Sequence, residues 1–172
     1  MIQVIDDFLP ASYHRNLLNL MSSDNFPWFY NDCVARNGDG EFFFTHNVFR
    51  YDAGGVNSDY WSEFHPMVYF IEEKLNFELE SLLRIRCNLY TNQNKELAHE
   101  SHVDQPNMQH YTGIYYLNTT NGQTNVGTET VDCVANRLVF FSGDILHNSN
   151  LQTDQHYRIN VNINVQGSFK NE

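Results

Sequence analysis

Two residues that commonly bind metal ions lie two positions apart in the sequence His102-Val103-Asp104. In an extended strand, residues i and i+2 project to the same side, so this imidazole and this carboxylate could ligate one metal ion from adjacent corners. The spacing is a weak signal when taken alone, because the chain has 8 histidines and 21 acidic residues. It becomes informative only together with residues that follow it.

A third ligand is offered by His147, which follows the turn Ser142-Gly143-Asp144 at the end of the apolar run 137–141. Such a turn suits the delivery of a ligand to a site beside the strand. Two histidines and one carboxylate on one face leave other coordination positions open, which is the arrangement of non-haem Fe(II) oxygenases. A 2-oxo acid could chelate the metal there through its carboxylate and keto oxygens.

The far carboxylate of such a 2-oxo acid would need a cationic partner, and Arg158 lies eleven positions after His147. The planar guanidinium group matches a carboxylate with two parallel hydrogen bonds. An arginine buried without an anion would be costly. Arg158 is therefore the candidate partner for the cosubstrate carboxylate.

The strand-like runs 84–90 and 158–165 alternate polar and apolar residues, so each presents one polar face. On alternation alone, the polar faces would point to water. A barrel with a ligand inside gives the opposite arrangement, with apolar faces under helices and polar faces toward a cavity. An inward Arg158 favours that second arrangement. The polar residues are Arg84, Arg86, Asn88 and Tyr90 in one run, and Arg158, Asn160, Asn162 and Asn164 in the other.

Helical patterns dominate the first half of the chain. Apolar residues at helical spacing predict a helix over 12–21 and helical structure over 59–75. Because Pro66 interrupts the second pattern, two shorter helices meeting near His65 are an equal alternative to one.

Strand patterns dominate the second half. A short strand is expected at 2–5, and a Gly/Asn/Asp turn at 37–40 divides the aromatic-rich segment 26–51. We expect one domain over residues 1–172, mainly β, with helices packed outside an antiparallel barrel or sandwich. Runs rich in Val, Ile, Phe, Tyr and Thr predict strands at 82–91, 111–117, 128–134, 137–142 and 157–166.

The composition restricts the partners and the location of the protein. The formal net charge is −11 with only 10 Lys and Arg, which argues against binding to nucleic acid. The three cysteines form no CxxC pair, so neither a disulfide framework nor a thiolate zinc site is expected. No run is long and apolar enough to span a bilayer, and the start lacks a secretory leader. We expect a cytoplasmic protein without a membrane partner.

With these residues in view, the sequence resembles the 2-oxoglutarate/Fe(II) oxygenase superfamily, and within it the prolyl 4-hydroxylase-like proteins. The resemblance covers residues 82–165, and besides the residues above it rests on the run Thr112–Asn118 and the segment 141–147. It implies a double-stranded β-helix (jelly-roll) barrel, with the helices that precede it packed outside and iron at one mouth. It also implies that His102, Asp104 and His147 bind the iron, and that Arg158 binds the distal carboxylate of 2-oxoglutarate.

The resemblance assigns further residues to the cosubstrate. Tyr116 matches a tyrosine that helps to bind the distal carboxylate in some members, and Thr112 lies on the same strand face. Tyr90 matches a tyrosine that lies near the cosubstrate on the strand before the metal motif. The alternative is that both tyrosines are aromatic core residues with satisfied hydroxyls, and that Thr112 is simply a strand former. His99 and His110, which flank the ligands, are expected to be supporting or surface groups.

The predicted activity is hydroxylation of an unactivated C–H bond, with Fe(II) as cofactor, 2-oxoglutarate as cosubstrate, and ascorbate as a candidate reductant. A prolyl residue in a peptide or protein is the expected target, and succinate and CO2 are the implied co-products. The chain departs from the prolyl hydroxylase pattern where many members have Lys in place of Arg158, and at Asn121-Gly122-Gln123-Thr124, where the family has Gly-Gly-x-Thr. The alternatives are hydroxylation of a free amino acid or another small molecule on the same fold, or a cupin-like metal-binding module without redox chemistry.

Overall fold

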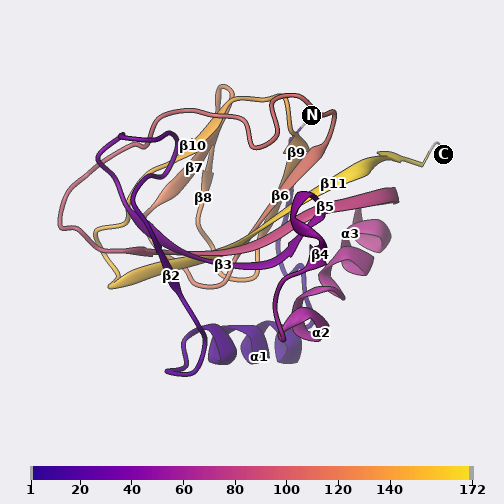
Figure 1. Cartoon of the computed structure of the whole chain (residues 1–172), viewed down its shortest axis with the longest axis horizontal. Coiled ribbons are helices and arrows are strands. Elements are labelled where there is room, and N and C mark those ends of the chain that lie inside the picture. The colour runs from indigo at the N-terminus through magenta and orange to yellow at the C-terminus, as the bar shows by residue number, and fades with distance from the viewer. Residues whose placement is uncertain (1, 171–172) are drawn as a thin grey trace.

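The computed structural model describes residues 2–170, so both ends of the expected 1–172 domain lie outside the described residues. The chain is mainly β, as predicted, and within residues 2–170 the helices lie in its first half (Figure 1). No helix in the described part is both long and apolar enough to cross a membrane. The helices are α1 (Ala11–Met21), α2 (Trp61–Phe64) and α3 (Met67–Leu75), with a 3-10 turn at Tyr51–Ala53. The strands are β1 (Ile2–Ile5), β2 (Phe29–Asn31), β3 (Phe43–Arg50), β4 (Gly55–Val56), β5 (Phe77–Thr91), β6 (Tyr111–Tyr116), β7 (Gln123–Val126), β8 (Glu129–Asp132), β9 (Leu138–Ser142), β10 (His147–Ser149) and β11 (Tyr157–Phe169).

The strands form two sheets in which every pairing is antiparallel. The larger sheet has the order β1-β9-β6-β11-β5-β3-β2, with β4 paired to β3, and the smaller one has the order β10-β7-β8. In Figure 1 the helices lie on one side of the larger sheet, and β7, β8 and β10 lie on the other side. This arrangement is a jelly-roll sheet fold, in which the cavity lies between the two sheets.

The helices cover the apolar face of the two long central strands. Ile85 and Cys87 of β5 and Ile159, Val161 and Ile163 of β11 are each at most 1 % exposed. They belong to the main core cluster together with Leu17 and Met21 of α1 and Met67, Val68, Ile71 and Leu75 of α3. By strand alternation, the polar residues of both strands must then point to the other side, between the sheets. The inward arrangement of the polar faces is the one that the structure has.

The predicted elements differ from the observed ones mainly at strand ends and in short polar strands. The strand expected at 82–91 begins at Phe77, because its first residues pair with the end of β11, where Phe77 lies opposite Phe169. Pro66 does separate two helices, α2 and α3. The sequence pattern missed β7 and β10, whose polar side chains give no β signal and whose strand structure depends on pairing with each other.

Candidate metal and cosubstrate site

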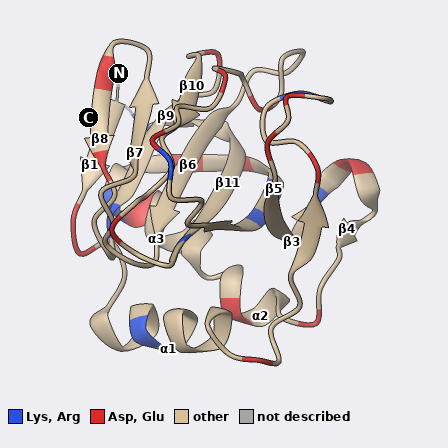
Figure 2. Cartoon of the chain, turned by 90° about the vertical axis from the view of Figure 1, so that its left-hand side faces the viewer, with Lys and Arg blue, Asp and Glu red and all other residues tan. Residues whose placement is uncertain are grey.

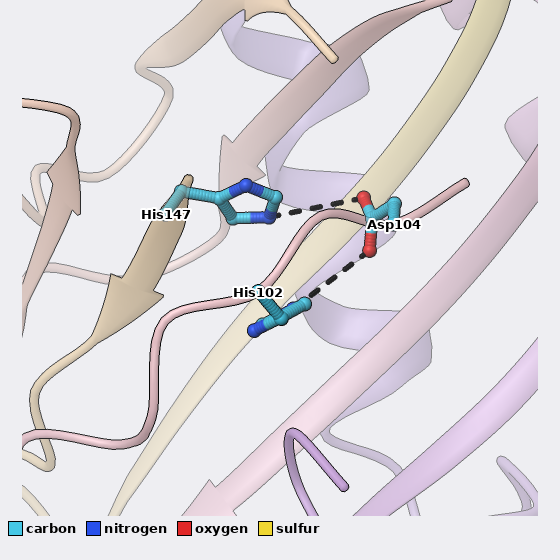
Figure 3. A group of neighbouring side chains, drawn as sticks. All are labelled: His102, Asp104 and His147. Atoms are coloured by element: carbon cyan, nitrogen blue, oxygen red, sulfur yellow. Dashed lines mark ion pairs between the residues drawn. The ribbon is translucent and has the colours of Figure 1, made fainter. Parts of the chain in front are cut away.

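His102 and His147 lie directly opposite each other across two reciprocal backbone hydrogen bonds. The N–H of His102 donates to the carbonyl oxygen of His147, and the N–H of His147 donates to that of His102, each at 3.0 Å. Residues paired in this way in an antiparallel ladder project to the same face. The two rings are accordingly 4.7 Å apart between centroids. Asp104, two positions after His102, turns its carboxylate toward both rings (Figure 3).

The three side chains form the one cluster in residues 2–170 in which three or more His, Cys, Asp or Glu could hold a metal ion. Nε2 of His102 is 3.9 Å from Oδ1 of Asp104, and Nε2 of His147 is 3.9 Å from Oδ2. All three ligand atoms lie within 4.8 Å of one another. A single ion placed among them would have three protein ligands and would keep other coordination positions open, because no other acidic or histidine side chain joins the cluster within the described chain.

Both histidines present the ring nitrogen that a metal needs. Nδ1 of His102 is 3.3 Å from the carbonyl oxygen of Glu100, and Nδ1 of His147 is 3.2 Å from that of Ile145. A carbonyl oxygen only accepts, so these contacts place the ring proton on Nδ1 and leave the lone pair on Nε2. Nε2 of His147 is buried without any hydrogen-bond partner. A buried polar atom of this kind fits a site for a metal ion.

Arg84 and Asn164 hold Asp104 in its ionised form. Arg84 Nη2 lies 2.7 Å from Oδ1, and the side-chain amide of Asn164 donates to Oδ2 at 3.0 Å. Burial alone would raise the pKa of Asp104, but the charges of Arg84, His147 and Arg86 and the hydrogen bond from Asn164 together hold the pKa well below its usual range. The carboxylate is therefore charged and oriented before any ion binds.

Arg158 lies fully buried in a cavity that also reaches the two histidines. The cavity wall includes His102, His147, Tyr90 and Thr124 beside Arg158. Nη2 of Arg158 donates to Oγ1 of Thr124 at 2.9 Å, and its Nε has no partner. No ion pair within residues 2–170 involves this guanidinium, so its charge is compensated only by neutral groups. An anion bound in the cavity would remove that cost.

The two predicted tyrosines flank the guanidinium group of Arg158. The central carbon of the guanidinium lies 5.8 Å from the ring centroid of Tyr90 and 5.5 Å from that of Tyr116. The Tyr116 hydroxyl donates to Oγ1 of Thr124 at 2.7 Å, and burial raises the pKa of both tyrosines. Thr112 lies elsewhere. Its hydroxyl accepts a hydrogen bond at 3.0 Å from the same Asn164 amide that contacts Asp104, so it lies near the metal ligands rather than near Arg158.

Three residues contact the predicted site residues but were not themselves predicted to belong to the site. Thr124 contacts both Arg158 and Tyr116, and its signal was the Gly-x-Thr remnant at 122–124. Arg84 and Asn164 both contact Asp104. They lie opposite each other in the pairing of β5 with β11. The alternating pattern placed both residues on the polar faces of their strands, but it could not show that these faces lie beside the metal motif.

His99 and His110 flank the ligands in sequence, and both are buried rather than at the surface. Neither ring nitrogen of His99 has a partner, and its ring lies 5.8 Å from that of Tyr90. Burial, and next the charge of Arg158, lower the pKa of His99 to about 4, so it is neutral at physiological pH.

The turn that delivers His147 depends on a glycine. Gly143 donates its N–H to the carbonyl oxygen of His110 at 2.8 Å. A Cβ atom at position 143 would lie 2.2 Å from Nε2 of the same histidine, so no larger residue fits without moving that ring. The backbone before β10 is thereby fixed against the segment that precedes β6.

The segment between β2 and β3 lies over the cavity, and Val34 forms part of the wall. Asp39 fixes its turn by accepting N–H hydrogen bonds from Val34, Ala35 and Arg36 at 2.8 to 3.2 Å. Arg36 also forms a two-point ion pair with Glu100, whose Nη2–Oε1 distance is 2.8 Å. The covering segment is therefore attached to the chain immediately before the metal motif.

Comparison with solved structures shows which fold carries this site. A 2OG-Fe(II) oxygenase family oxidoreductase from Burkholderia pseudomallei superposes with a TM-score of 0.75 at 12 % identity, covering 99 % of this chain and 89 % of that one. A prolyl hydroxylase from Trichoplax adhaerens, in complex with a peptide fragment of the hypoxia inducible factor oxygen degradation domain, gives 0.61 at 19 % identity, covering 95 % and 82 %. The chain has the fold of the 2-oxoglutarate/Fe(II) oxygenases.

A third structure widens the range of chemistry found on this fold. The epimerase SnoN, in complex with Fe3+, alpha-ketoglutarate and nogalamycin RO, gives a TM-score of 0.64 at 13 % identity, covering 96 % of this chain and 78 % of that one. No protein-family model and no curated protein sequence matches the chain. The likeness to these oxygenases is therefore one of fold, and the reaction has to be argued from the site itself.

Proposed function

We propose that the protein is an Fe(II)- and 2-oxoglutarate-dependent oxygenase that hydroxylates an unactivated C–H bond. The observation that carries the proposal is one cavity that joins a His-Asp-His cluster to a buried arginine without a carboxylate partner. A metal-binding module without redox chemistry would need the cluster but would have no use for Arg158. Only a ligand that both chelates a metal and ends in a second anion uses both features.

His102, Asp104 and His147 would hold the iron, which when bound supplies the oxidising chemistry that couples decarboxylation of 2-oxoglutarate to hydroxylation. Arg158 would bind the distal carboxylate of 2-oxoglutarate, with the hydroxyl of Thr124 beside it. The aromatic ring of Tyr90 lies against the same guanidinium group, whose central carbon is 5.8 Å from the ring centroid. These residues bind and orient the cosubstrate, and the protein supplies no general base to the reaction.

A prolyl residue in a peptide or protein is the first candidate target. The prolyl hydroxylase from Trichoplax adhaerens, which has this fold, is in complex with a peptide. In the present protein, two exposed aromatic side chains on β2 suit an extended chain: Phe29 is 60 % exposed and Tyr30 is 64 % exposed. A free amino acid or another small molecule is the alternative, because SnoN, with the same fold, is in complex with the small molecule nogalamycin RO.

Anaerobic addition of Fe(II) and 2-oxoglutarate tests the reaction class. A weak visible charge-transfer band should form in the native protein, be lost in Asp104→Ala and be weakened in Arg158→Ala. Absence of the band, together with no gain in thermal stability from 2-oxoglutarate, would rule out the oxygenase. For the target, proline-rich peptides incubated with the aerobic enzyme should gain 16 mass units, and a set of peptides without that gain contradicts the prolyl assignment alone.

A further inference from the structure

The cavity wall is positively charged although the chain as a whole is acidic. Acidic residues lie along the outer loops and helices (Figure 2), and the formal net charge is −11. On the inner face of β5 and β11 over 84–90 and 158–164, by contrast, Arg84, Arg86 and Arg158 are the charged residues. Within residues 2–170 their one carboxylate partner is Asp104, which pairs with Arg84. The other two guanidinium groups, of Arg158 and Arg86, form no ion pair in the described chain.

Arg86 is the second of these groups, and the proposed function gives it no role. It lies two positions from Arg84 and opposite Asn162 of β11, between the metal end of the cavity and Arg158. It is part of the cavity wall together with His102. Its Nε is buried without a hydrogen-bond partner, and it takes part in no ion pair in the described chain. Such a group is costly unless an anion reaches it.

Aromatic stacking fixes the orientation of the Arg86 guanidinium. Its central carbon lies 5.5 Å from the ring centroid of Phe43. The Phe43 ring stacks on Tyr90 at 5.3 Å with an interplanar angle of 18°, and Arg158 lies over Tyr90. The two unpaired guanidinium groups therefore contact the same pair of stacked rings, Arg86 at Phe43 and Arg158 at Tyr90, and Arg158 contacts Tyr116 as well. Stacking on a ring leaves the N–H edge of a guanidinium free to bind an oxyanion with two hydrogen bonds.

The ligands of the proposed function do not balance this charge. Three guanidinium groups and a divalent iron exceed Asp104 and the two carboxylates of 2-oxoglutarate by two positive charges. One carboxylate of 2-oxoglutarate is used by the metal and the other by Arg158, so neither is left for Arg86. In a cavity of which Arg86 and Arg158 both form part of the wall, this excess favours a further anion.

We propose that Arg86 binds a carboxylate of the substrate, and that the substrate of this enzyme is therefore an acid. The inference rests on the proposed function and narrows it. The substrate is then a free amino acid, another small carboxylic acid, or a peptide with a carboxylate close to the hydroxylated carbon. A neutral prolyl segment alone would leave Arg86 without a partner.

A pair of small probes that differ only in charge tests the inference. N-acetyl-L-proline carries the carboxylate, and N-acetyl-L-prolinamide is its neutral counterpart. Each is titrated into protein loaded with Mn(II) and saturating 2-oxoglutarate, and binding is followed by calorimetry and by thermal unfolding. The acid should bind at least about 30-fold more tightly than the amide, as expected for one buried ion pair between the carboxylate and Arg86. Arg86→Gln should abolish that preference, and Arg86→Lys should retain part of it.

The control is Arg50→Gln, which removes a cation of β3 that pairs with Asp52 outside the cavity and should leave the preference unchanged. Equal binding of acid and amide, or binding of neither, overturns the inference. It is also overturned if Arg86→Gln weakens 2-oxoglutarate itself, because Arg86 then belongs to the cosubstrate site. Failure of the native protein to bind 2-oxoglutarate in the first step overturns the proposed function instead. Unfolding of ligand-free Arg86→Gln at a much lower temperature would assign Arg86 a structural role.

Discussion

Replacement of Arg158 by methionine should separate the stability of the empty fold from the binding of the cosubstrate. The substitution removes two hydrogen bonds, to Thr124 at 2.9 Å and to the Asn150 carbonyl oxygen at 3.3 Å, and the contacts with two aromatic rings. These are worth several kcal/mol together. Removal of a buried, unpaired charge recovers a desolvation penalty of similar size. The free energy of unfolding without ligand should therefore change by no more than about 2 kcal/mol.

The effect on ligand binding should be much larger. Loss of one partner of a buried ion pair costs about 3–5 kcal/mol, which raises the dissociation constant of 2-oxoglutarate at least about a hundredfold. At a concentration one hundred times the native dissociation constant, 2-oxoglutarate should stabilise the native protein by about 2.7 kcal/mol. At the same concentration it should stabilise Arg158→Met by about 0.4 kcal/mol or less.

Denaturant unfolding with Mn(II), with and without 2-oxoglutarate, measures both quantities in one experiment. Arg50→Met is the matched control, since its partly exposed pair with Asp52 contributes little and neither residue is part of the cavity wall. The reasoning is refuted if Arg158→Met keeps the full stabilisation by 2-oxoglutarate. It is equally refuted if the ligand-free variant loses much more than 2 kcal/mol, because Arg158 would then be a structural residue.

Two further predictions concern the histidines that flank the site. Because the folded pKa of His99 is about 4, below its unfolded value of 6.5, the stability from neutral His99 is present above pH 6.5 and is lost as the pH falls toward 4. Unfolding titrations of His99→Gln should lack up to roughly 3 kcal/mol of that decline, and parallel native and His99→Gln curves contradict the assignment. Gly143→Ala should lower the free energy of unfolding by about 1–3 kcal/mol through its clash with the His110 ring, and adding His110→Ala should recover part of the loss. Purely additive effects in that double-mutant cycle would show that the clash is not the cause.

The sequence was most informative where a local rule controls the structure. The alternation in β5 and β11 placed Arg158, Asn160, Asn162 and Asn164 on one face, because strand geometry alone requires it. It could not decide which face is inside, since that depends on helices that cover Val161 and its apolar neighbours from another part of the chain.

The site was less predictable wherever it depends on register between distant strands. Two positions separate His102 from Asp104, and that spacing is visible in the sequence. The backbone pairing of His102 with His147 is not, because it joins segments 45 positions apart. Thr124 was missed as a site residue for the same reason: its strand, Gln123–Val126, is too polar to be recognised by pattern, and pairing with its neighbours holds it in place.

The alternation of β11 over residues 158–164 also has an evolutionary consequence. Residues that pack under the helices and residues that line the cavity occupy alternate positions of one strand, so substitutions at one set need not disturb the other. A mutation at Asn160 or Asn162 would alter which molecules fit while the helix-facing residues remain intact. The same scaffold could therefore acquire new substrates in single steps without first losing its ability to fold. A directed library restricted to Arg86, Asn88, Asn160 and Asn162 would be the natural place to search for such changes.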